Sequence, residues 1–179
     1  KFPSKHDIVL EVERLTSAKK LSGKNVMIAT GATFEKMDAM RGLTNRSSGR
    51  MGVEIAKEFY RQGANVTLIC GLMHTHVPKV FERVDVESTQ EMMDAVTQRI
   101  KDTDIYVSVA AISDFTFEDV SLGKISSDED ITVKLTRLPK LLEQVKKINK
   151  YVTSSMVIFD ALILLVVAIS VLQGNRSML

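Results

Sequence analysis

Apolar positions follow two different periods along the chain, and their alternation indicates the order of its elements. Largely apolar runs at 25–30, 65–70 and 104–109 predict three buried strands, and a short further strand is predicted at 82–86. Apolar and polar residues alternate from 131 to 135, a pattern typical of a half-exposed strand.

Between these strands, apolar residues recur at every third or fourth position, as they do on one face of a helix. The helices predicted in this way span 5–15, 51–62, 88–100 and 139–148. Ser88 and Glu91 form a capping box at the start of the third helix. Because strands alternate with helices, we expect an α/β, Rossmann-like three-layer domain with a mainly parallel sheet. The stretch 31–49, rich in polar residues and glycine, is predicted to be irregular.

Composition and charge exclude several classes of protein. Lys plus Arg number 24 and Asp plus Glu number 22, so the formal net charge is only +2 and no basic stripe for nucleic acid is present. A hydrophobic fraction of 45% excludes a disordered chain. The single cysteine, Cys70, excludes an internal disulfide and fits a reducing cytoplasm. His74 and His76 have a metal-ligand spacing but few partners, and we interpret them as loop residues.

The polar run before the second helix is the first candidate site. Ser47, Ser48 and Gly49 precede this helix, and free N–H groups at a helix N-terminus attract anions. A phosphate site and a simple N-cap at Ser47 or Ser48 are both open at this point. The chain has neither the G-x-G-x-x-G fingerprint of dinucleotide-binding proteins nor a G-x-x-x-x-G-K-[ST] loop, which disfavours an NAD(P)-dependent reductase and a P-loop enzyme.

Several ordered motifs then carry a resemblance to one family. They are a strand followed by Gly31 and Thr33, the pair Asp38 and Arg41, and the run from Asn45 to Gly52. Matching blocks follow at 63–68, 110–115 and 123–125. From about residue 4 to 159 the chain resembles the phosphopantothenate–cysteine ligase domain of the bifunctional phosphopantothenoylcysteine decarboxylase/phosphopantothenate–cysteine ligase family.

This resemblance implies a reaction of coenzyme A biosynthesis. A nucleoside triphosphate, CTP more than ATP, activates the carboxylate of 4′-phosphopantothenate as an acyl nucleotide, and the amine of cysteine then forms the amide. Mg²⁺ is expected to accompany the triphosphate. The family also implies a homodimer in the cytoplasm and a decarboxylase half elsewhere in the full-length protein.

The resemblance assigns roles to particular residues of this chain. Asn45 and Lys124 are the implied catalytic residues, and Asp38, Arg41 and Asn45 contact the substrate. The implied nucleotide-binding residues are Gly31, Ser47, Ser48, Gly49, Ala110, Ala111, Asp114, Lys124 and Phe159. Taken without the family, Asp38 and Arg41 read as a loop ion pair, Lys124 as a surface lysine and Asp114 as a turn former.

Two departures from the family leave a second interpretation open. Members of the family have further lysines after the one at position 124, and this chain has Ser126 and Ser127 there instead. Beyond residue 161 this chain is apolar, whereas the family has a Lys-rich segment. The alternative is therefore a catalytically incomplete nucleotide-binding module of the same fold. We expect a linker helix at 1–20, a ligase domain at 21–160 and a divergent tail at 161–179 that packs on protein and does not anchor in a membrane.

Overall fold

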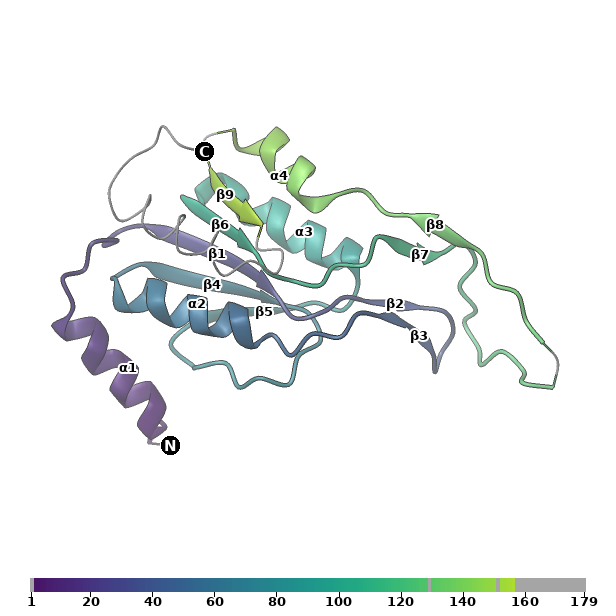
Figure 1. Ribbon diagram of the computed structural model, residues 1–179, viewed down its shortest axis with the longest axis horizontal. Helices are drawn as coiled ribbons and strands as arrows, with labels where there is room; N and C mark the ends of the chain where they lie inside the picture. The colour runs from purple at the N-terminus through teal and green to yellow at the C-terminus, as the bar shows by residue number, and fades with distance from the viewer. Residues whose placement is uncertain (1, 129, 151, 157–179) are drawn as a thin grey trace.

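The computed structural model describes residues 2–128, 130–150 and 152–156, which form three layers with a sheet in the middle (Figure 1). The sheet has five parallel strands in the order β5-β4-β1-β6-β9. Their bounds are β1 Asn25–Thr30, β4 Asn65–Cys70, β5 Glu82–Asp85, β6 Ile105–Ser108 and β9 Thr153–Met156. The α/β fold with a mainly parallel sheet is therefore confirmed.

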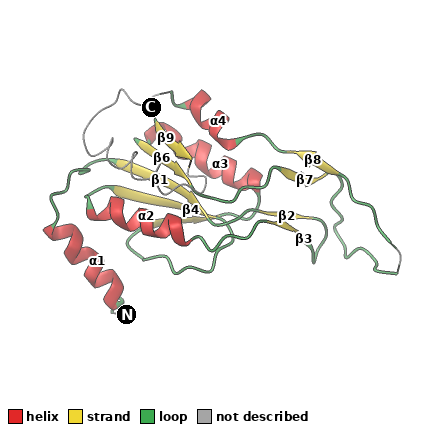
Figure 2. Ribbon diagram, in the orientation of Figure 1, coloured by secondary structure: helices red, strands yellow, loops and turns green. Residues whose placement is uncertain are grey.

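Helices cover both faces of this sheet (Figure 2). On one face, α2 (Arg50–Arg61) packs on β1 and β4, with α1 (Lys5–Thr16) against it. On the other lie α3 (Thr89–Arg99), which continues into a 3₁₀ turn at Ile100–Asp102, and α4 (Leu141–Ile148). Alternate residues of β1 point to opposite faces of the sheet. Val26 and Ile28 belong to the hydrophobic core on the α2 face, and Met27 and Ala29 belong to the core on the face of α3 and α4.

An arginine ties α1 to the end of α2. The Arg14 guanidinium donates to the carbonyls of Tyr60 (2.8 Å), Gly63 (2.9 Å) and Ala64 (2.6 Å), and it lies 4.2 Å from the centre of the Tyr60 ring. These carbonyls belong to the last turn of α2 and its exit, where the helix leaves acceptors without partners and a cation is favourable. Helix α1 thus belongs to the same packed unit as the sheet.

Two short antiparallel pairs extend past the carboxyl ends of the sheet strands, and we call these pairs, together with the described residues that join their strands, the arm (Figure 1). One pair is β2 (Phe34–Lys36) with β3 (Gly42–Thr44), and the other is β7 (Phe115–Phe117) with β8 (Leu135–Arg137). The expectation of irregular structure throughout 31–49 was therefore wrong. The strand expected at 131–135 is also wrong, because the paired residues begin at Leu135 and all three are exposed.

The apolar end of the chain, including Phe159 and the predicted tail at 161–179, lies outside the described residues. Within the described ranges, no helix is both long enough and apolar enough to cross a lipid bilayer. The division into linker, domain and tail stays a prediction.

Candidate functional site

Three loops join at the carboxyl edge of the sheet and form the floor of the candidate site. Ala32 and Leu72 exchange two backbone hydrogen bonds of 2.9 and 2.7 Å, and the Ala111 amide donates to the Gly31 carbonyl at 2.8 Å. The loops after β1, β4 and β6 are thus paired with one another beyond the ends of their strands. Gly31, Ala110 and Ala111, three predicted nucleotide-binding residues, lie together at this edge, where parallel sheets bind ligands.

Helix α2 begins at this edge without a side-chain cap. Its N-cap is Gly49, whose φ of 71° is left-handed, and no side chain accepts a capping hydrogen bond there. A simple N-cap at Ser47 or Ser48 is therefore excluded. Each hydroxyl accepts a long hydrogen bond of 3.4 Å from the backbone amide two residues later in the chain, Gly49 for Ser47 and Arg50 for Ser48. No acidic residue lies in the first turn, so the positive end of the helix dipole is not neutralised within the helix. Ser47, Ser48 and Gly49 are placed where an anion is favoured.

Gly52 allows α2 to approach the end of β1. A Cβ at this position would lie 2.3 Å from Thr30 Oγ1 and 2.4 Å from Thr30 Cβ. The Thr30 hydroxyl is buried and donates to the Gly49 carbonyl at 3.1 Å. Close contact between this helix and this strand therefore depends on the missing side chain.

We expect Gly52→Ala to lower the free energy of unfolding by about 1–2 kcal/mol, because overpacking costs about 1–3 kcal/mol and the better helix propensity of alanine offsets about 1 kcal/mol at most. Urea denaturation measures the change. Gly123→Ala is the control, since a Cβ there meets nothing within 4 Å. Equal stability of the two variants would contradict the close packing described for Gly52.

Two threonines that carry no predicted role hold the site together. Thr33 is fully buried, and its hydroxyl accepts from the Ser113 amide at 2.9 Å and pairs with the Thr89 hydroxyl at 2.9 Å. Thr75 donates through its amide (3.3 Å) and hydroxyl (2.7 Å) to the Ser48 carbonyl. Thr33 was visible only as part of the family motif, whereas Thr75 lies in a loop with no distinguishing pattern.

Asn45 follows β3 and reaches back to the floor of the site. Its side-chain amide donates to the carbonyls of Ala111 (3.3 Å) and Ile112 (3.4 Å), two long hydrogen bonds from an exposed residue. The structure therefore brings Asn45 next to Ala110 and Ala111. Its predicted catalytic role stays a prediction.

Asp38, Arg41 and Lys124 form a second group, on the arm. Arg41 donates to Asp38 Oδ2 through Nε (2.9 Å) and Nη2 (2.6 Å). The Asp38 carboxylate is wholly buried, and the Arg41 guanidinium beside it holds the pKa of that carboxyl well below its usual range. Lys124 is exposed and has no ion-pair partner among the described residues. No hydrogen bond of the described chain joins this group to the floor of the site.

Among the described residues, Asp114 forms hydrogen bonds neither with the floor of the site nor with the group of Asp38, Arg41 and Lys124. Its carboxylate forms an ion pair with Lys140, and both side chains are more than half exposed. An exposed pair of this kind contributes little to stability, so Asp114 is available to a ligand at small cost. Its predicted nucleotide contact stays a prediction, and that of Phe159 lies outside the described residues.

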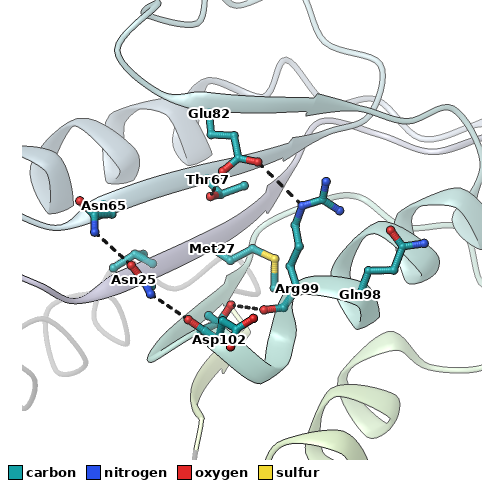
Figure 3. Close-up of a pocket in the computed structure, with 10 residues that line it drawn as sticks. Asn25, Met27, Asn65, Thr67, Glu82, Gln98, Arg99 and Asp102 are labelled. Carbon is teal, nitrogen blue, oxygen red and sulfur yellow. Dashed lines mark hydrogen bonds and ion pairs between the residues drawn. The ribbon is translucent and has the colours of Figure 1, made fainter.

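A polar pocket of about 300 Å³ lies at the opposite edge of the sheet, around the first residues of β1 and β4 (Figure 3). Its side chains satisfy one another: Asn65 donates to Asn25, Asn25 to the Asp102 carbonyl and Thr67 to Glu82, at 3.1, 3.0 and 3.0 Å. None of the predicted site residues lines it. The carboxyl edge remains the candidate site.

Comparison with known proteins shows what this chain is similar to. The coenzyme A biosynthesis bifunctional protein CoaBC of Thermococcus kodakarensis is 38% identical over 152 residues, which are 83% of this chain and 37% of that protein. The chain spans about a third of the length of the curated relatives it matches.

Two solved structures share the fold. The crystal structure of the C-terminal domain of CoaBC has a TM-score of 0.68 at 31% identity and covers 76% of this chain and 65% of its own. A Cab2 mutant in complex with phosphopantothenate-cysteine has a TM-score of 0.62 at 17% identity, covers 97% of this chain and 78% of its own, and shows the fold alone.

The model of one protein family matches residues 21–162, which include β1, the arm, α2 and every predicted site residue. That family is described as the DNA/pantothenate metabolism flavoprotein C-terminal domain. The resemblance carried by the motifs is thereby confirmed, and the chain belongs to the family of DNA/pantothenate metabolism flavoprotein C-terminal domains.

Proposed function

We propose that this chain is the ligase part of a coenzyme A biosynthesis protein and joins 4′-phosphopantothenate to cysteine at the expense of a nucleoside triphosphate. The observation that carries the proposal is the glycine-capped N-terminus of α2 at the carboxyl edge of the sheet, with Asn45 and Ala111 beside it. The bifunctional relatives act in coenzyme A biosynthesis by name, and the chain matches a third of their length.

The reaction has two balanced steps. In the first, a carboxylate oxygen of 4′-phosphopantothenate attacks the α-phosphorus, the bond to the β-phosphate breaks and pyrophosphate leaves. In the second, the amine nitrogen of cysteine attacks the acyl carbon and the bond from that carbon to the bridging oxygen breaks. The nucleoside monophosphate leaves with the bridging oxygen, the acyl oxygen stays in the amide, and the ammonium nitrogen loses two protons. Both steps place negative charge on oxygens, so the site must supply hydrogen-bond donors and cations in fixed positions.

The residues of the site match these needs. The uncapped first turn of α2 with Ser47, Ser48 and Gly49 supplies donors for phosphate oxygens. The Asn45 amide lies close enough to the floor to turn from two long hydrogen bonds toward an acyl oxygen. Lys124 is an exposed cation without a competing ion pair among the described residues and neutralises charge on the triphosphate.

The co-substrates and partners belong to the same proposal. CTP is the preferred nucleotide, and Mg²⁺ binds to the triphosphate oxygens and keeps much of its water shell, so the site needs no dense carboxylate cluster of its own. The protein acts in the cytoplasm as a homodimer beside a decarboxylase domain. The arm carries exposed apolar side chains that a subunit contact would cover, among them Met40, Val120 and Leu122.

We expect CTP or ATP with Mg²⁺ to raise the melting temperature of the protein, whereas NADPH leaves it unchanged. A ligand at a hundred times its Kd adds about 2.7 kcal/mol to the free energy of unfolding, enough for a clear shift. Thermal unfolding with each nucleotide measures binding, and product formation from 4′-phosphopantothenate, cysteine and nucleotide measures turnover. A melting temperature raised by NADPH but not by CTP or ATP with Mg²⁺ would contradict the proposal.

The second candidate is a nucleotide-binding module of the same fold that has lost turnover. Ser126 favours it, because it stands where the family has a further lysine and its hydroxyl pairs locally with Asp128. Stabilisation by nucleotide without amide product would select this candidate. Pyrophosphate release with product would select the ligase.

A further inference from the structure

Both backbone groups of the residue after Lys124 are held by one ion pair. The Ile125 amide donates to Asp38 Oδ2 at 3.1 Å, and the Ile125 carbonyl accepts from Arg41 Nη2 at 2.7 Å. A residue whose N–H and C=O are both bonded has its peptide planes fixed in direction. Two residues on the β2–β3 turn thus fix the chain immediately after Lys124, although they lie more than 80 positions away in sequence.

The Asp38 carboxylate is fully used in this arrangement. Oδ1 accepts from the amides of Met40 and Arg41, at 2.7 Å each, while Oδ2 accepts from the Arg41 side chain and the Ile125 amide. The side chain has no exposed surface. A substrate contact by Asp38 would therefore require these bonds to break, which disfavours the direct role that the family resemblance implies.

The rest of the loop between β7 and β8 has few other attachments. Among the hydrogen bonds of its described residues, the remaining one to the β2–β3 turn joins the Ser121 amide to the Met37 carbonyl at 3.0 Å. Between the two attachment points, Leu122 is 99% exposed and Gly123 has open space around it. Lys124 thus lies on a short, solvent-exposed span whose far end is fixed at Ile125.

We propose that Asp38 and Arg41 are positioning residues, which hold the segment bearing Lys124 by binding both backbone groups of Ile125. The part of this proposal that concerns catalysis rests on the proposed function, because Lys124 acts there on the triphosphate. The attachment itself does not rest on it. Asp38 and Arg41 then affect nucleotide activation through Lys124, and neither needs to touch a substrate.

The attachment is tested by amide hydrogen exchange at Ile125, measured by NMR on the full chain. We expect Asp38→Asn to speed exchange of this amide about tenfold or more, because a hydrogen bond to a charged acceptor has at least this effect. Trypsin should also cleave faster after Lys124. Asp119→Asn, an exposed aspartate of the same loop that, among the described residues, forms no hydrogen bond with Ile125 or its neighbours, is the matched control and should change neither rate.

A second variant keeps the test decisive if Asp38→Asn fails to fold. Arg41→Lys retains a positive charge beside Asp38 but removes the planar guanidinium that bridges Asp38 and the Ile125 carbonyl. It should also speed exchange at Ile125, by less than the loss of the carboxylate. Unchanged exchange at Ile125 in a folded variant of either residue would overturn the proposal.

Coupling to Lys124 is tested by a double-mutant cycle on pyrophosphate release. If Asp38 acts through Lys124, Asp38→Asn slows release in the wild-type background and has little further effect in the Lys124→Gln background. If Asp38→Asn slows pyrophosphate release by the same factor in both backgrounds, Asp38 acts independently of Lys124, and the positioning role is overturned. If neither the wild type nor any variant releases pyrophosphate, the proposed function fails. The exchange rates at Ile125 still show whether Asp38 and Arg41 hold this residue.

Discussion

Lys124→Gln should slow the formation of the acyl nucleotide about 10²–10³-fold, the typical effect of removing one electrostatic contact to a developing charge. The lysine is exposed on the arm, so its loss leaves the packed core unchanged. Pyrophosphate release from CTP or ATP in the presence of 4′-phosphopantothenate measures the effect directly. The melting temperature should stay within a degree or two of the wild type, as is usual for surface substitutions.

A second lysine on the arm provides the control. Lys134 is exposed and has no ion-pair partner among the described residues, and Lys134→Gln removes the same charge from the same part of the molecule. We expect it to leave the rate within a few-fold of the wild type. If the two substitutions slowed pyrophosphate release equally, Lys124 would contribute only to the general charge of the arm.

Asn45→Ala should bind nucleotide almost as well as the wild type and yet form little amide product. An amide donor aimed at the acyl oxygen matters most when that oxygen gains charge, so its removal costs about 10²–10³ in the amide-forming step. The two long hydrogen bonds to Ala111 and Ile112 contribute little to the fold, and stability should barely change. Nucleotide affinity and amide formation are measured separately.

Asn65→Ala is the matched control, because Asn65 is an exposed asparagine at the opposite edge of the sheet. It should affect neither measurement. The assignment of Asn45 to the amide-forming step is lost if nucleotide binding weakens while product formation per bound nucleotide is preserved. That result would make Asn45 part of the support for the phosphate loop.

Three strands of the central sheet, β1, β4 and β6, were predictable because most of their residues are buried, whereas β9 has no counterpart among the predicted strands. Strands β1 and β4 begin and end where the apolar runs predict, and Ser88 caps α3 as expected by accepting from the Glu91 amide. The arm was not predictable from periodicity. Its four strands have only three residues each, and β3 and β8 are exposed along their whole length, so no apolar repeat marks them.

In the site, too, features that depend on neighbouring residues were predictable, and contacts between residues far apart in sequence were not. The position of the run from Ser47 to Gly52 before a helix is predicted from the local sequence, and the structure places the run at the N-terminus of α2. The spacing of Asp38 and Arg41 predicts only their mutual ion pair. Nothing near them in sequence indicates that they also bind Ile125, because that contact depends on how the two halves of the arm meet in three dimensions.

The bonds of Arg14 have a consequence for how the protein is divided in the laboratory. The segment that matches the family model begins at residue 21, after α1, yet three carbonyls at and just past the end of α2 accept hydrogen bonds from Arg14 of α1. Leu10 of the same helix is buried and belongs to the hydrophobic core on the α2 face of the sheet. The cooperative folding unit is therefore larger than the family-matching unit, and an expression boundary drawn at residue 21 removes part of the hydrophobic core as well as the cap of α2.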